Sequence, residues 1–113
     1  ELYGRETYTM EGDPSIPVIV DCWLKGLRGY DINKAYTAMK KGATTDEKHN
    51  PLRPDNNEYM AKGYISLRDS FDNSVSHALE YYVADNALSR LAKALGHKED
   101  AKLFYKRSLG YRN

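Results

Sequence analysis

The chain has 113 residues, of which 41% are hydrophobic and 29% are charged, a composition typical of one soluble globular domain. Its 17 lysines and arginines are balanced by 16 aspartates and glutamates, and the two signs are interspersed, so no basic stripe indicates a nucleic-acid partner. The single cysteine, Cys22, excludes an intramolecular disulfide, and no apolar run approaches the roughly 18 residues needed to cross a membrane.

The first predicted element is a helix over residues 15–28. Asp13 or Ser15 can accept hydrogen bonds from its first free amides, and Pro17 suits the first turn, where no amide donor is required. Apolar side chains extend almost all round this helix, as in a helix with neighbours on several sides. The β-branched residues 18–20 would also fit a buried strand, but the proline and the following glycines favour a helix.

The second predicted helix spans residues 31–42 and begins at the capping residue Asp31. Apolar side chains recur on it at the spacing of three and four that defines one buried face: Ile32, Ala35, Tyr36 and Met39. Because only residues 29–31 link it to the first helix, we expect the two helices to form an antiparallel hairpin.

Residues 43–73 show no apolar periodicity beyond a short turn near residue 59, and they include Pro51 and Pro54. We therefore predict a long loop. Connections of this length inside a compact domain are commonly functional.

A long third helix is predicted over residues 74–95, ending before Gly96, and a fourth over residues 98–109. The fourth has acidic residues in its first turn and basic residues in its last, the order that the helix dipole favours. The prediction is thus an all-α chain of four main helices, arranged as tandem αα-hairpins with a long loop between the pairs. Such a tandem is typical of a helical toroid or solenoid.

The sequence offers little local chemistry. His49, His77 and His97 lie far apart, with no second histidine or cysteine at ligand spacing, so no metal site is predicted. Motifs for a nucleophilic serine, a P-loop or a dinucleotide fold do not occur. One carboxylate is less easily explained: Glu80 lies beside two tyrosines in a mainly apolar helix, so it either faces a polar pocket or pairs with a partner such as Arg90.

Three motifs, in this order, resemble an internal segment of the glycoside hydrolase family 92 α-mannosidases. They are E-T-x-x-M-x-G at Glu6 to Gly12, V-I-x-D-x-x-x-K-G-x-R-G-x-D at Val18 to Asp31, and V-S-x-x-L-E-Y at Val75 to Tyr81. Relatives often read Y-x-D-D after the last motif, whereas this chain has alanine at position 84.

The resemblance implies that residues 1–113 are one helical segment of a larger catalytic domain, an (α/α)6 toroid. The implied enzyme is secreted or periplasmic, requires calcium, and removes mannose from α-mannosides, including α-1,2-linked ones, with inversion. Inversion needs a carboxylic acid and a carboxylate base. The family motifs that resemble these groups are absent here, so no catalytic residue and no calcium ligand is assigned. Glu6 and Glu80 are assigned a substrate-binding role only.

On this interpretation the segment is inactive alone and exposes apolar helix faces through which it could self-associate. A helical-repeat module that binds a peptide or protein in its groove is the alternative, supported by the hairpin at residues 74–109. A purely structural domain is the third interpretation.

Overall fold

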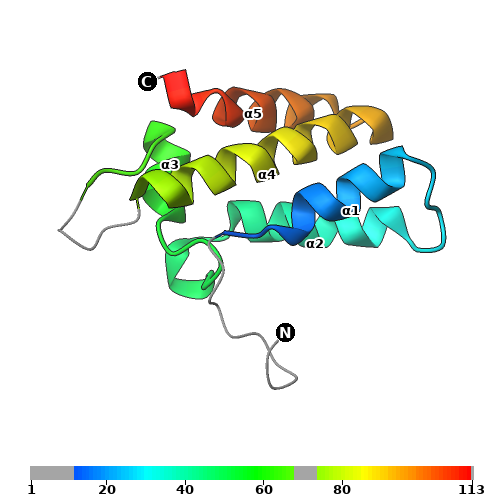
Figure 1. Cartoon of the computed structure of the whole chain (residues 1–113), viewed down its shortest axis with the longest axis horizontal. Helices are drawn as coiled ribbons and strands as arrows, with labels where there is room; N and C mark the ends of the chain where they lie inside the picture. The colour runs from blue at the N-terminus through cyan, green and yellow to red at the C-terminus, as the bar shows by residue number, and fades with distance from the viewer. Residues whose placement is uncertain (1–11, 68–73, 113) are drawn as a thin grey trace.

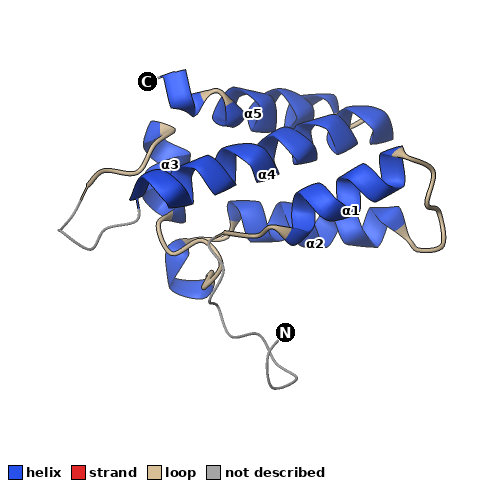
Figure 2. Ribbon diagram, viewed as in Figure 1, coloured by secondary structure: helices blue, strands red, loops and turns tan. Residues whose placement is uncertain are grey.

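The described residues of the computed structural model, 12–67 and 74–112, form helices and connecting turns, and no strand occurs among them. The elements are α1 (Ser15–Leu24), α2 (Ile32–Thr44), η1 (Glu47–His49), α3 (Asn56–Lys62), α4 (Ser74–Leu95), α5 (Lys98–Ser108) and η2 (Gly110–Arg112). The predicted all-α class is confirmed (Figure 2). No helix in these ranges is long and apolar enough to cross a lipid bilayer.

The long helix α4 is the centre of the fold. It packs along α5 on one side and against α1 and α2 on the other (Figure 1). The largest buried cluster joins all four helices: Ile16, Val20, Tyr36, Met39, Ala43, Ala84, Leu88, Leu91, Ala92 and Phe104. This explains why the apolar pattern of α4 covers several sides of the helix, since neighbours contact it from more than one direction.

Helix α1 ends at Leu24, four residues before the predicted end near residue 28. The cause is Gly26, which has a left-handed φ of 101°. Around it, the Gly26 amide bonds the Trp23 carbonyl and the next amide bonds the Cys22 carbonyl. Such a glycine closes the last turn of a helix and redirects the chain. At the other end of α1, neither predicted side-chain cap forms, and the backbone carbonyl of Asp13 accepts the Ile16 amide.

The predicted cap of α2 is confirmed, because the Asp31 carboxylate accepts hydrogen bonds from the Asn33 and Lys34 amides at 3.0 and 3.2 Å. Helices α1 and α2 run in opposite directions, as expected for a hairpin (Figure 1). Each packs chiefly on α4, however, so the hairpin is held together by the central helix.

The long predicted loop is partly helical, since η1 and α3 both lie within it. It is fastened to the end of α2 by two buried asparagines. Asn50 donates to the carbonyls of Gly42 and Thr45 at 2.6 and 3.2 Å, and Asn56 donates to Thr45 at 2.7 Å. The last carbonyls of a helix have no partner within it, so these side chains supply what the helix lacks. The segment from η1 to α3 is therefore partly helical and bonded to the end of α2.

A second cluster packs α3 against the first half of α4: Tyr59, Ile65, Ala78, Tyr81 and Tyr82. Gly110 of η2 contacts it closely. A side chain at Gly110 would collide with the Gly63 carbonyl oxygen and would lie 2.7 Å from the Tyr82 ring. The Tyr82 hydroxyl donates to that same carbonyl at 2.8 Å. Glycine at position 110 thus lets the end of the chain lie directly on α3 and α4.

Candidate functional site

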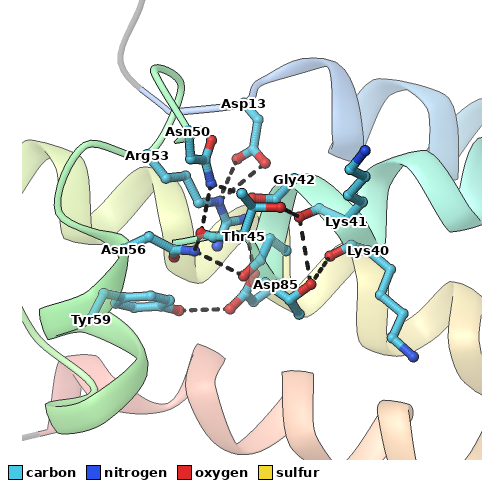
Figure 3. A network of polar contacts seen from close by, with 12 residues as sticks. Asp13, Lys40, Lys41, Gly42, Thr45, Asn50, Arg53, Asn56, Tyr59 and Asp85 are labelled. Carbon is cyan, nitrogen blue, oxygen red and sulfur yellow. Dashed lines mark hydrogen bonds and ion pairs between the residues drawn. The ribbon is translucent and has the colours of Figure 1, made fainter. Parts of the chain in front are cut away.

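A fully buried arginine joins three separate parts of the chain. Arg53, in the turn before α3, directs its Nε to both carboxylate oxygens of Asp13, at 3.1 and 3.2 Å. Its Nη2 donates to Asp85 Oδ1 in the middle of α4 at 2.9 Å. Figure 3 shows the guanidinium between the two carboxylates. One cation therefore ties the start of α1 to the centre of α4.

Asp85 is bonded or paired with three side chains. Besides Arg53, it accepts a 2.9 Å hydrogen bond from the Tyr59 hydroxyl, and Arg107 Nη1 lies 3.8 Å from its Oδ2. Arg107 also donates to the Ala43 carbonyl at 3.0 Å. The cluster thus includes side chains from α3, α4 and α5 as well as the turn before α3, and it bonds the backbone of α2.

Burial changes the ionisation of these groups. It raises the pKa of the Asp85 carboxyl above its ordinary value, although Arg53, Arg107 and Tyr59 all favour the charged form. Burial alone would lower the pKa of Arg53, but the charges of Asp85 and Asp13 and their hydrogen bonds outweigh it, so its pKa is raised. Arg53 is thus a permanent buried cation, and two carboxylates surround it.

The cluster leaves one polar atom incompletely paired. Arg53 Nη1 is buried and has no hydrogen-bond acceptor in the described part of the chain. The guanidinium carbon lies 4.9 Å from the centre of the Tyr81 ring, a cation–π contact. The aromatic face supplies part of the stabilisation that an acceptor would give. Because Asp13 and Asp85 both bind this guanidinium in the interior, neither is open to a sugar, and the cluster is a structural tie.

The two predicted substrate-binding glutamates do not belong to this cluster. Glu6 lies outside the described residues. Glu80 is exposed on α4, and Arg90 lies ten residues, about 15 Å, further along the same helix, too far away to pair with it. It lies next to Gly12, where an added Cβ would be 3.1 Å from the Glu80 Cβ and 3.4 Å from the Tyr81 ring. The end of the first motif and the L-E-Y motif are therefore adjacent, which brings together two of the three stretches that carry the family resemblance.

Sequence reasoning missed the members of the buried cluster. Asp13 was predicted as a helix cap, and Arg53 and Tyr59 fell in a predicted loop. Asp85 offered a usable sign, because a carboxylate inside an apolar helix requires a partner. The sequence did not show which of Glu80 and Asp85 is buried, since they lie on different faces of a helix that is apolar on several sides.

The three histidines lie in different places, as their spacing predicts. His49 Nδ1 is 3.1 Å from Asp46, His77 Nδ1 is 2.8 Å from Asp55, and the His97 ring stacks on Tyr36 at 4.8 Å. Within residues 12–67 and 74–112, no three histidine, cysteine, aspartate or glutamate side chains gather in a group that could hold a metal ion.

The buried tyrosines predict a steep loss of stability in alkali. Burial raises the pKa of Tyr36, Tyr59, Tyr81 and Tyr82. A tyrosine in the unfolded chain ionises at about pH 10, whereas the buried tyrosines ionise only at higher pH. The stability of the folded state is therefore highest below about pH 10 and falls as the pH rises above it. Near-ultraviolet absorbance should show these tyrosinates forming in the same transition that removes the helical circular dichroism. Their ionisation with helicity intact would contradict this.

Comparisons with known proteins complete the description of the site. The sequence profile of the glycosyl hydrolase family 92 catalytic domain matches residues 1–113, the whole chain. No curated protein sequence matches it.

The solved structures similar to this chain include two of a family GH92 α-mannosidase from Bacteroides thetaiotaomicron. One is a complex with mannoimidazole, with 35% sequence identity and a TM-score of 0.84. The other has 35% identity and a TM-score of 0.83. Each match covers 97% of this chain and 14% of the solved chain, so residues 1–113 span about a seventh of the length of that enzyme.

Proposed function

This chain belongs to glycosyl hydrolase family 92, and we propose that it is a helical part of the catalytic domain of an exo-acting α-mannosidase. The observation that carries the proposal is the match, at 35% identity and over 97% of the chain, to a solved α-mannosidase. The complete enzyme then contains the (α/α)6 toroid and works outside the cytoplasm. Its substrates are α-mannoside glycans, with α-1,2 linkages preferred.

The buried cluster supports the proposal that residues 1–113 contribute structure to such an enzyme and that its catalytic groups lie in other parts of the chain. An inverting hydrolase needs an acid and a base that both reach the sugar, separated by roughly 6.5–9.5 Å so that water fits between them. Asp13 and Asp85 are instead bound to the same guanidinium in the interior. We therefore propose that the acid and base lie elsewhere in the complete enzyme and that residues 1–113 alone are inactive. The ligands of the calcium ion are likewise proposed to lie outside the described residues.

Within this proposal, Glu80 and Glu6 bind the substrate. A carboxylate that accepts a hydrogen bond from a sugar hydroxyl contributes to binding without taking part in the bond-breaking step. Glu80 lies next to Gly12, the last residue of the motif that begins at Glu6, and this contact supports a role for the motif near Glu80.

The test is an assay of the complete polypeptide that contains residues 1–113. It should release mannose from an α-1,2-linked mannobiose faster than from α-1,3- or α-1,6-linked ones. Nuclear magnetic resonance should show the β-anomer forming first, since inversion of an α-mannoside gives β-mannose. A chelator should abolish turnover and added calcium restore it. Residues 1–113 alone serve as the inactive control. Turnover of an aryl α-mannoside by that control would overturn the proposal that the catalytic acid and base lie outside residues 1–113.

Replacing Glu80 in the same enzyme with glutamine should raise KM by about tenfold with a smaller change in kcat, because it weakens one charge-assisted hydrogen bond. Glu99→Gln on α5 is the matched control, since Glu99 is 89% exposed and lies on a different helix. An equal fall in kcat and kcat/KM for Glu80→Gln would contradict a binding role. Peptide binding by the complete polypeptide, without mannose release, would favour the helical-repeat alternative.

A further inference from the structure

A histidine–aspartate pair lies beside Glu80 in the first half of α4. His77 Nδ1 is 2.8 Å from Asp55 Oδ2, and Asp55 is the residue from which α3 begins. His77 and Glu80 are three residues apart, so their side chains are neighbours on the surface of one helix. Gly12 contacts the same part of α4, since an added Cβ there would be 3.1 Å from the Glu80 Cβ. The fold therefore places an imidazole beside a carboxylate at this position.

Two contacts fix the orientation of the His77 ring. A carboxylate only accepts hydrogen bonds, so Nδ1 is the donor in the contact with Asp55. The ring also packs on the fully buried Tyr81 ring, with the two centres 6.2 Å apart and the planes inclined by 24°. Within residues 12–67 and 74–112, the contact with Asp55 is the only hydrogen bond that the imidazole makes. Nε2 is thus held in a fixed direction and is not used by these residues.

Exposure distinguishes this pair from the Arg53 cluster. The side chains of His77 and Asp55 are 22% and 13% exposed, whereas those of Arg53 and Asp85 are completely buried. A molecule bound at the surface of α4 can therefore reach the pair. A carboxylate that bonds one nitrogen of an imidazole sets the role of the other nitrogen, which is how histidines are prepared for binding and for proton transfer.

We propose that His77 binds a sugar hydroxyl group of the substrate next to Glu80, and that Asp55 is the positioning residue that orients it. The proposal rests on the proposed function, in which Glu80 binds an α-mannoside. With the proton on Nδ1, Nε2 of the neutral ring accepts a hydrogen bond, as the Glu80 carboxylate does. Two neighbouring acceptors suit two hydroxyl groups of one sugar ring, because each hydroxyl group donates one hydrogen bond.

The competing interpretation is that the pair only ties α3 to α4. Two substitutions separate these roles, because each retains one half of the imidazole. His77→Asn keeps an amide near the Nδ1 position, facing Asp55, and removes the group at Nε2. His77→Gln places its amide near the Nε2 position and loses the short contact with Asp55. Asparagine therefore keeps a structural tie and loses a substrate contact, whereas glutamine does the reverse.

The test measures kcat/KM of the complete polypeptide for α-1,2-linked mannobiosides that each lack a different hydroxyl group. On the unmodified substrate, His77→Asn should lower kcat/KM by about tenfold, chiefly through KM, because one hydrogen bond is lost. On the analogue that lacks the hydroxyl group bound by His77, wild type and variant should agree within about twofold, since that bond is already absent. His77→Gln should lose less than His77→Asn. Asp55→Asn should depend on the same hydroxyl group, with a smaller effect.

His49→Asn is the matched control. His49 also pairs with an aspartate, Asp46, at 3.1 Å, but in an exposed contact at η1. This variant should leave kcat/KM unchanged on every substrate. The free energy of unfolding of each variant, followed by circular dichroism, reports separately on any structural tie.

Equal losses for His77→Asn on every analogue would overturn the proposal, because they would show that no single hydroxyl group is recognised. A larger loss of both kcat/KM and stability for His77→Gln than for His77→Asn would also overturn it and identify the pair as a tie between helices. The wild-type protein checks the proposed function separately. If it releases no mannose from any of these substrates, the proposed function fails and this inference fails with it. Normal wild-type turnover with equal losses on every analogue overturns the His77 contact alone.

Discussion

Replacement of Arg53 by methionine is expected to destabilise the folded chain by about 3–5 kcal/mol. The side chain is fully buried, and its removal leaves the carboxylates of Asp13 and Asp85 in the interior without their shared cation. An uncompensated buried charge costs far more than the loss of an exposed ion pair. Denaturant unfolding followed by circular dichroism measures the change.

Two further variants make the Arg53 result specific. Arg112→Met removes an exposed arginine from η2 and should leave the free energy of unfolding unchanged. Adding Asp13→Asn and Asp85→Asn to Arg53→Met should recover part of the lost stability, because the neutral amides leave no buried charge. A loss of less than about 1 kcal/mol for Arg53→Met, the range of an exposed pair, would show that the cluster does not tie the fold together.

Truncation of Phe104 to alanine should cost a similar amount, about 3–5 kcal/mol, through a different mechanism. Phe104 is the fully buried anchor of α5 and packs in the cluster that includes Leu88 and Leu91 of α4. Its removal leaves a cavity between the two helices that neighbouring side chains fill only in part. The measurement is again denaturant unfolding, with the midpoint and slope compared.

The neighbouring residue provides the control for this truncation. Leu103 is 43% exposed, so Leu103→Ala should cost about 1 kcal/mol or less. Equal losses for the two alanine variants would show that α5 is not anchored through Phe104.

The extent to which the fold follows from the sequence differs from helix to helix. The third predicted helix coincides with α4, because its apolar residues recur over six turns and Gly96 stops it. The end of α1 was predicted four residues too late, since Leu27 continues the apolar pattern although Gly26 has already turned the chain. Periodicity alone does not detect that turn.

Helix α3 was predicted only as a short turn near residue 59, for a different reason. It has only seven residues, too few for a periodic pattern to emerge. Its burial depends on contacts from distant parts of the chain, as Tyr59 packs against Tyr81 and Tyr82 of α4. Besides that turn, Gly63, with a left-handed φ of 79°, marked the end of the helix in the sequence.

The candidate site residues also differ in how far the sequence predicts them. Family resemblance pointed to Glu6 and Glu80, and their binding role stays a prediction. The buried cluster depends on Arg53, which follows Pro51 and precedes Pro54 in a stretch that resembles an ordinary loop. Its importance arises from two carboxylates that the folded chain brings to it, and one sequence taken alone contains no sign of that pairing.

The separation of the cluster's members along the chain has a consequence for the order in which the protein folds. Arg53 is 40 residues from Asp13 and 32 residues from Asp85, whereas α4 and α5 are joined by two residues. The hairpin of α4 and α5 can therefore close early, and the charged cluster closes only after distant segments have met. Contacts made after the rate-limiting step slow unfolding and leave the folding rate nearly unchanged. We therefore expect Arg53→Met to accelerate unfolding more than it slows folding, which folding and unfolding rates measured in denaturant would check.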